Sequence, residues 1–342
     1  MNQEKSLITT DVDFDQDGFQ AGTLRLPYSH DKSGYGHIPI PIAVLKRGHG
    51  PTVLLTGGNH GDEYEGPVAL MKLVHRMPSM KINGRLIVIP GLNFPAVLNG
   101  SRTSPIDKAN LNRVFPGRRN GSPTEMIAHY VDTELFPRAD FVFDIHAGGA
   151  STNYLPTLMV APPADRVRRD NLRRLVDAFA APRVMVMDLL GEDRTYGAAV
   201  ARHEALFFCG EFGGYASCGV EGVELVESGI RRVLNALDVC AEPGPEAPAN
   251  HGRLLRVEGD GHYLFAPCPG IFEPVFRLGD EVAAGQLAAR IHDPHAPWKP
   301  ALELRFKRSG LAVCIRSLAR VEAGDCLGHL ASDTTWAEAC AE

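Results

Sequence analysis

A histidine and a glutamate three positions apart follow a short apolar run, and their side chains are suited to metal binding. His60 and Glu63 come after the run Val53–Thr56 and two glycines. Such a run flanked by glycines is typical of a buried strand that ends in a tight loop. Ligands of open α/β sheets bind outside the carboxyl ends of the strands. Imidazole and carboxylate both bind Zn²⁺, although a lone His-x-x-Glu pair is common by chance.

A second apolar run, Phe141–His146, also ends in a histidine that glycines follow. Its last residue is therefore expected in the loop layer above the sheet. His60, Glu63 and His146 form the ligand set of catalytic zinc sites, which leaves a fourth position open. One such histidine could merely cap its strand, but two in the same context favour a metal. We expect one Zn²⁺ per chain, while Co²⁺ or Fe²⁺ would suit the same ligands.

Glu211 is the candidate proton-transfer group. It ends a third apolar run and is flanked by Gly210 and by Gly213 and Gly214. A carboxylate beside the metal can take a proton from the attacking water and pass it to the departing amine. By itself this residue would be interpreted as a strand-end glutamate facing solvent, but the three ligands favour the catalytic interpretation.

The segment 100–117 has the Ser, Asn, Pro and Gly content of a loop and carries Arg102 and Arg113. Guanidinium groups bind carboxylates in a two-pronged geometry and can stabilise the oxyanion of an attacked carbonyl. An anionic substrate is therefore expected. The alternative is a solvated loop with surface arginines.

These segments, in this order, resemble the succinylglutamate desuccinylase/aspartoacylase family, within the zinc carboxypeptidase-like hydrolases. The resemblance spans residues 53–214. It implies roles for seven residues: the zinc ligands His60, Glu63 and His146, the general acid/base Glu211, the carbonyl-polarising Arg102, and the carboxylate-binding Asn112 and Arg113.

The chain departs from the family pattern at Asn110, where many relatives have an aspartate that orients a zinc-bound histidine. An amide oxygen can still accept the imidazole proton, though without a charge that raises ligand basicity. Asp107 is the other candidate for this role.

Within the family, Leu55–Pro67 and Asn110–Gly117 most resemble the Nα-acetyl-2,4-diaminobutyrate deacetylases of ectoine degradation. The resemblance implies removal of acetate from a small N-acyl amino acid. Deacylation of another N-acyl amino acid, a metallocarboxypeptidase acting on peptides, and a non-catalytic scaffold are the alternatives. The sequence does not identify the residue that meets the substrate's side-chain ammonium.

The composition of the 342 residues, 44% hydrophobic and 22% charged, is typical of a globular protein. With a net charge of −6 and no dense basic cluster, a nucleic-acid partner is not expected. The arginines of 166–174 are interpreted as a solvated helix face, because Val167, Leu172, Leu175, Val176 and Phe179 recur at helical spacing. Neither a signal peptide nor a membrane-spanning run is found. The seven cysteines are odd in number and contain no Cys-x-x-Cys spacing, which favours a reducing cytoplasm over a disulfide scaffold. Homo-oligomerisation and association with the upstream pathway hydrolase are left open.

Strands and helices are expected to alternate up to a Pro-rich connector at 241–250. Apolar runs predict strands at 40–46, 53–57, 85–90, 140–146, 156–161, 183–188 and 206–212. Helical spacing predicts helices at 64–77, 122–135, 165–180, 193–203 and 222–240. This alternation predicts an α/β catalytic domain, residues 1–243, with a mixed, mostly parallel sheet covered by helices on both faces.

Residues 244–342 are expected to form a small all-β domain of barrel-sandwich type. Val282-Ala-Ala-Gly285 and Val321-Glu-Ala-Gly324 each precede an apolar strand, 39 positions apart (282 to 321). This repeat predicts a duplicated hairpin.

Overall fold

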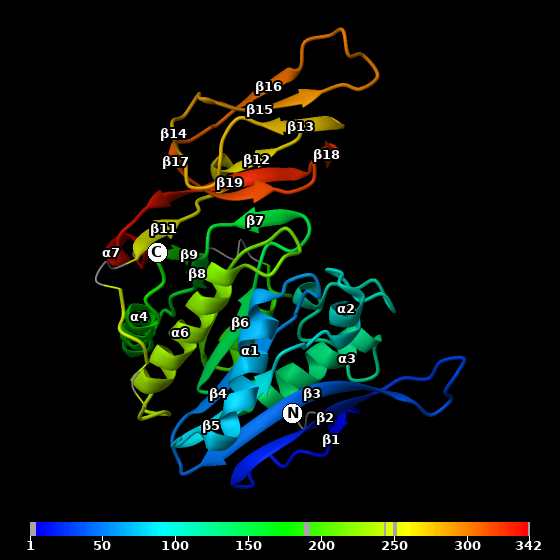
Figure 1. Ribbon diagram of the computed structural model, residues 1–342, viewed down its shortest axis with the longest axis vertical. Helices are drawn as coiled ribbons and strands as arrows, with labels where there is room; N and C mark the ends of the chain where they lie inside the picture. Colours follow the sequence, from blue (N-terminus) through cyan, green and yellow to red (C-terminus); the bar gives the residue numbers. More distant parts are fainter. Residues whose placement is uncertain (1–4, 188–191, 243, 249–251, 341–342) are drawn as a thin grey trace.

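The computed structural model describes residues 5–187, 192–242, 244–248 and 252–340. A long mixed sheet runs through this part of the chain, from the N-terminal hairpin to the C-terminal strands (Figure 1). Its strands, in spatial order, are β1 (Thr9–Thr10), β2 (Gly18–Pro27), β3 (His37–Arg47), β5 (Gly84–Ile89), β4 (Thr52–Gly57), β6 (Phe141–His146), β10 (Leu206–Glu211), β8 (Thr157–Val160), β9 (Arg183–Val186), β11 (Arg253–Arg256), β19 (Cys326–Asp333), β17 (Gly310–Arg316) and β14 (Glu281–Val282). Off this path, β12 (Tyr263–Phe265) pairs with β19 and β7 (Thr152–Tyr154) with β17.

The centre of the sheet consists of parallel strands. β5, β4, β6 and β10 are neighbours that run in the same direction. Every residue of β4 and β6 is buried, which is why these strands are continuous apolar runs. The carboxyl ends of β4, β6 and β10 meet at one edge, where Glu211 is in register with His146. This edge brings together segments that are far apart in the sequence.

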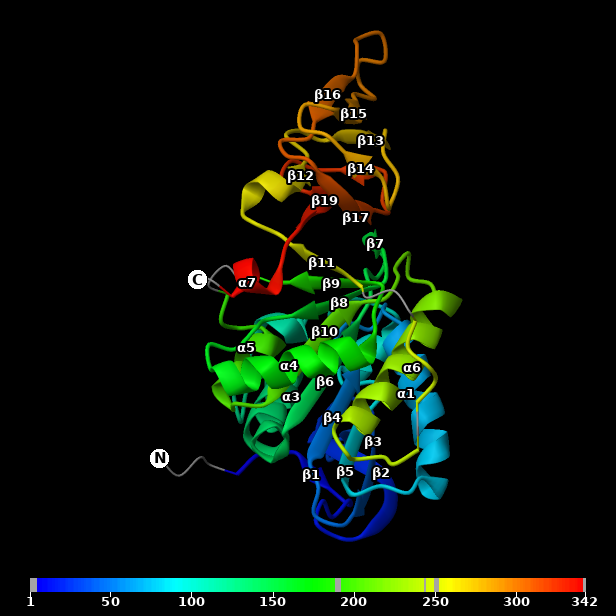
Figure 2. The ribbon, with the colours of Figure 1, turned by 90° about the vertical axis from the view of Figure 1, so that its left-hand side faces the viewer.

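Helices cover both faces of the central sheet (Figure 2). One face is covered by α1 (Glu65–Arg76), α4 (Arg166–Phe179) and α6 (Val220–Ala236). The other face is covered by α3 (Pro123–Tyr130), which continues as a π-helical turn to Leu135, and by α5 (Tyr196–Arg202). The predicted α/β fold class is confirmed, and each predicted strand and helix up to residue 240 overlaps an observed one. Residue 188, the predicted end of a strand, lies outside the described residues.

The arginine-rich segment forms α4, as expected. Its N-cap Asp165 accepts a hydrogen bond from the backbone N–H of Arg168, and Leu172, Leu175, Val176 and Phe179 are buried. Val167, however, is 69% exposed. Its inclusion in the buried face was wrong, because at 3.6 residues per turn Val167 points about a third of a turn away from the centre of the face formed by the other four residues.

Several elements were not anticipated: strands β1 and β2, strand β7, and the helices α2 (Phe94–Asn99) and α7 (Trp336–Ala339). β7 joins the C-terminal strands through β17, with Cys314 opposite Tyr154. β7 has only three residues, which is too short for a recognisable local pattern. Its partner lies 160 positions farther on in the sequence (154 to 314), so the pairing could not be anticipated.

Beyond the connector the chain is β-rich, and a separate antiparallel sheet lies at the far end of the molecule (Figure 1). It consists of β16 (Leu302–Arg305), β15 (Leu287–His292), β13 (Gly270–Pro274) and β18 (Arg320–Val321). The two Val-x-Ala-Gly segments adopt the same turn, in which Gly285 and Gly324 have positive φ angles of 82° and 92°. Glycine is favoured there because L side chains clash at positive φ.

The β-rich part is continuous with the central sheet. β11 runs parallel to β9 and antiparallel to β19. Residue 243, at the proposed domain boundary, lies outside the described residues. Within the described residues, no helix has the length and apolar character needed to cross a membrane.

Candidate active site

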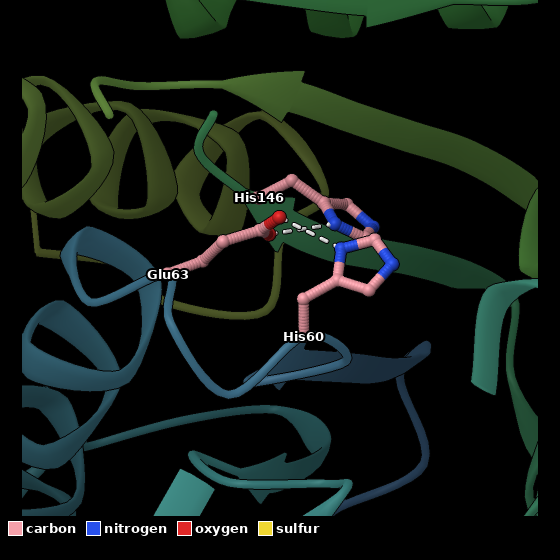
Figure 3. Close-up of side chains that lie close together, drawn as sticks. All are labelled: His60, Glu63 and His146. Atoms are coloured by element: carbon pink, nitrogen blue, oxygen red, sulfur yellow. Dashed lines mark hydrogen bonds and ion pairs between the residues drawn. The ribbon is translucent and has the colours of Figure 1, made fainter. Parts of the chain in front are cut away.

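His60, Glu63 and His146 converge beyond the carboxyl ends of β4 and β6 (Figure 3). Glu63 Oε1 lies 2.7 Å from His60 Nδ1, and Glu63 Oε2 lies 2.9 Å from His146 Nδ1. One ligand atom from each residue lies within 4.8 Å of the others, and all three residues are buried. The expected convergence is therefore confirmed, and the triad is able to hold a metal ion.

The loop that carries His60 is held by close packing against α2. A Cβ atom at Gly61 would lie 2.0 Å from the carbonyl carbon of Ala96, so only glycine fits at this position. The Gly61 N–H donates to the Ser101 carbonyl, and Glu63 directly precedes Tyr64, the N-cap of α1. The Gly-Asp-Glu sequence thus sets the direction in which both ligands project.

Each histidine is held from behind by an acceptor outside the triad. His60 Nε2 lies 3.1 Å from Asn110 Oδ1, and His146 Nε2 lies 2.8 Å from Asp144 Oδ2. Nε2 of each ring therefore carries a proton, and Nδ1 is directed at Glu63. A cation bound among the three residues would take the Nδ1 lone pair of each ring together with a carboxylate oxygen of Glu63, so the donor set fits a divalent metal.

Asn110 rather than Asp107 lies behind His60. Asp107 instead accepts hydrogen bonds from the backbone N–H and the hydroxyl of Thr124, both at 2.8 Å. The amide oxygen of Asn110 also accepts from the Asn112 N–H, which fixes its orientation.

The charges in the triad stabilise each other strongly. Burial opposes the charged forms, yet the neighbouring His60 and His146 lower the pKa of Glu63. Burial likewise disfavours the His146 imidazolium, but Asp144 and Glu63 raise its pKa well above 6.5. Buried charges of this kind persist only when they are paired.

Glu211 lies next to this triad on β10, opposite His146. Burial and the charge of Glu63 raise the pKa of Glu211 to about 8, against the opposing effects of His146 and Arg102. Its Oε2 atom is buried, and no hydrogen-bond partner for it is found among the described residues. A carboxyl group in this state is suited to exchanging protons near neutral pH.

Arg102 reaches the triad directly, with Nη1 3.3 Å from His60 Nδ1 and 3.5 Å from Glu63 Oε1. Arg113 is half-buried; burial, followed by the nearby charge of Arg102, lowers its pKa. Asn112 accepts a hydrogen bond from the Tyr196 N–H through Oδ1. Its Nδ2 group is therefore the end available to a ligand, as a donor.

These side chains line one cavity of about 600 Å³. All the candidate site residues except Glu63 contribute to its wall. Glu63 lies next to the wall, where it contacts His60 and His146. The C-terminal part contributes Tyr263 and His329. The sequence analysis missed these residues, together with Asp144 and Tyr154. Asp144 could have been found, because residues two apart on a strand share a face.

Residues 49–237 match the family model described as "succinylglutamate desuccinylase/aspartoacylase catalytic domain". The chain belongs to this family. The Nα-acetyl-L-2,4-diaminobutyric acid deacetylase of Halomonas elongata is 38% identical over 329 residues, 96% of each chain. A product-bound structure of the ectoine utilization protein EutE (DoeB) from Ruegeria pomeroyi is 36% identical with a TM-score of 0.91, covering 96% of this chain and 100% of the other. A succinylglutamate desuccinylase/aspartoacylase from Rhodobacter sphaeroides is 37% identical with the same TM-score and coverage.

Proposed function

We propose that this protein is a zinc-dependent amidohydrolase that releases acetate from Nα-acetyl-L-2,4-diaminobutyrate. The observation that carries the proposal is the buried triad of His60, Glu63 and His146, with Glu211 beside it in the wall of the same cavity. Similarity along 96% of the chain to a deacetylase of this substrate supports the choice of substrate.

The ligand set supports zinc as the metal. Two imidazoles and one carboxylate form the protein part of many catalytic zinc sites. When bound, Zn²⁺ acts as a Lewis acid toward the carbonyl of the scissile amide.

The chain's own residues would bind the substrate and transfer the proton. Arg113 and the Nδ2 group of Asn112 bind the α-carboxylate, since both present N–H donors to the cavity. Arg102 stabilises the negative charge that develops on the attacked carbonyl oxygen. Glu211 accepts a proton from the attacking water at Oε2 and donates it to the departing amine.

A substrate panel with and without metal would test this proposal. The purified protein is assayed for acetate release from Nα-acetyl-diaminobutyrate, for hydrolysis of other N-acyl amino acids, and for amino-acid release from dipeptides. Hydrolysis of the first substrate, its loss after chelation and its recovery with Zn²⁺ are expected. Preference for dipeptides would instead indicate a carboxypeptidase, and turnover that survives complete metal removal would exclude the metal mechanism.

A further inference from the structure

The proposed substrate carries a side-chain ammonium, but each carboxylate among the described residues that line the cavity already has another role. Among the described residues lining the cavity, the carboxylates are Asp144 and Glu211. Asp144 is engaged by His146, and also accepts hydrogen bonds from Thr56 and Asn59. Glu211 is needed for proton transfer in the proposed reaction. A different acceptor must therefore recognise the ammonium.

One wall of the cavity consists of three rings that come from both parts of the chain. Tyr154 belongs to β7, Tyr263 to β12 and His329 to β19. The ring centroids of His329 lie 5.4 Å from Tyr154 and 5.2 Å from Tyr263. Ring faces carry partial negative charge and attract cations. This aromatic wall, the residues Tyr154, Tyr263 and His329, therefore suits a positively charged group.

The hydrogen bonds of His329 determine which way the Tyr154 hydroxyl donates. His329 Nδ1 lies 3.3 Å from the Leu330 carbonyl, which can only accept, so the proton is on Nδ1. Burial lowers the pKa of His329 to about 4, with a smaller contribution from His262 and against the effect of Leu330. The ring is therefore neutral near pH 7, and its Nε2 is an acceptor. The Tyr154 hydroxyl, 3.1 Å from Nε2, donates to it.

A hydroxyl whose only proton is already donated can offer nothing but lone pairs to other groups. The Cys314 thiol is a second possible acceptor for the Tyr154 hydroxyl on the β17 side. A thiol sulfur accepts only weakly, so the hydroxyl proton goes to His329 Nε2 and the oxygen lone pairs can accept from a ligand. Glu211 interacts electrostatically with both Tyr154 and Arg102. Glu211 is therefore close both to the aromatic wall and to Arg102.

We propose that Tyr154 determines specificity by accepting a hydrogen bond from the substrate's side-chain ammonium, and that His329 is the positioning residue that orients its hydroxyl. This inference rests on the proposed function, because it assigns the part of the cavity that distinguishes a diamino acid from a neutral one. The C-terminal β-rich part thereby completes the substrate site.

The test compares Nα-acetyl-diaminobutyrate with Nα-acetyl-norvaline, in which a methyl group replaces the ammonium. With wild-type protein the charged substrate should have the higher kcat/KM. Tyr154→Phe should lower kcat/KM for the charged substrate by about 10- to 100-fold, mainly through KM, as expected for one hydrogen bond to a charged group. Nα-acetyl-norvaline has no ammonium that could lose a hydrogen-bond partner, so its kcat/KM should change by less than about threefold. Tyr35→Phe, at a fully exposed tyrosine, is the matched control.

The role of His329 is tested by two replacements. His329→Gln provides an amide oxygen that can accept from Tyr154, whereas His329→Leu cannot. The glutamine variant should keep more of the preference for the charged substrate than the leucine variant. Thermal unfolding and metal content of each variant identify misfolded protein.

Two results would overturn the inference while leaving the proposed function intact: a wild-type protein that hydrolyses both substrates equally well, or a Tyr154→Phe variant that slows both substrates by the same factor. A wild-type protein that hydrolyses no N-acyl amino acid would refute the proposed function itself.

Discussion

Oδ2 of Asp144 lies 2.8 Å from Nε2 of His146, two residues farther along strand β6, and this contact turns Nδ1 of the histidine toward Glu63. Asp144 is in turn fixed by hydrogen bonds of 2.8 Å from the Thr56 hydroxyl and from Asn59 Nδ2. The orientation of a metal ligand thus depends on buried groups of two neighbouring strands.

Replacement of Asp144 by asparagine should weaken metal binding without removing a ligand. Partners of this kind typically contribute about 10- to 100-fold to metal affinity, so we expect a rise of that size in the Kd for Zn²⁺. Competition with a chromogenic chelator measures it. Asp170→Asn, at an exposed position of α4, is the control. An unchanged Kd in the Asp144 variant would contradict this role.

Loss of the ligand His146 should have a larger effect than loss of its partner. His146→Ala removes one of three ligand atoms, and we expect purified protein with little bound metal. Elemental analysis checks this against His295→Ala, a variant of an exposed histidine. Full metal occupancy in His146→Ala would show that the cation binds elsewhere.

Glu211→Gln should separate metal binding from turnover. The side chain is not one of the three grouped ligands, so the variant should retain its metal. General acid–base catalysis contributes about 10²- to 10⁴-fold, and kcat should fall by that factor in a steady-state assay. Glu224→Gln, on the exposed side of α6, serves as the control. Equal loss of metal in the Glu211 and His146 variants would reassign Glu211 to the ligands.

The raised pKa of Glu211 predicts a pH-dependent stability difference in metal-free protein. Burial and Glu63 raise this pKa from 4.5 to about 8. The folded state therefore favours the protonated carboxyl, and the resulting stability is complete below pH 4.5 and is lost as the pH rises through about 8. Glutamine does not titrate. The Tm of Glu211→Gln relative to wild type should rise between pH 5 and 8, and a constant difference would mean that the pKa is not raised.

Arg113 should contribute to substrate binding more than to the chemical step. Its guanidinium is held by a 2.7 Å hydrogen bond from Nη1 to the Asn112 carbonyl. Loss of a charge-assisted contact costs about 1.5–3 kcal/mol, which corresponds to about a 10- to 100-fold rise in KM for Arg113→Ala. Arg113→Lys keeps the charge but not the planar fork and should recover only part of this loss. A change confined to kcat would assign the arginine to the developing oxyanion instead.

Much of the catalytic part could be predicted because its signals are local. The runs that became β4, β6 and β10 are continuous apolar segments, since parallel central strands are buried on both faces. Glycines after each run marked where the chain leaves the sheet. β7 was missed for the opposite reason: its three residues are only partly buried, and they are a strand only because β17 lies beside them.

The amino-acid sequence by itself determined which residue types end neighbouring strands, and hence that His60, Glu63 and His146 could share a cation. It also determined the α/β class, because apolar residues recur at different spacings in strands and in helices and these spacings can be recognised directly in the sequence. Only the tertiary structure decided that Asn110 rather than Asp107 stands behind His60, and that His329 reaches the cavity from the far end of the chain. The physical reason is that hydrogen-bond partners are chosen by distances of about 3 Å, and such distances between remote segments exist only once the chain has folded.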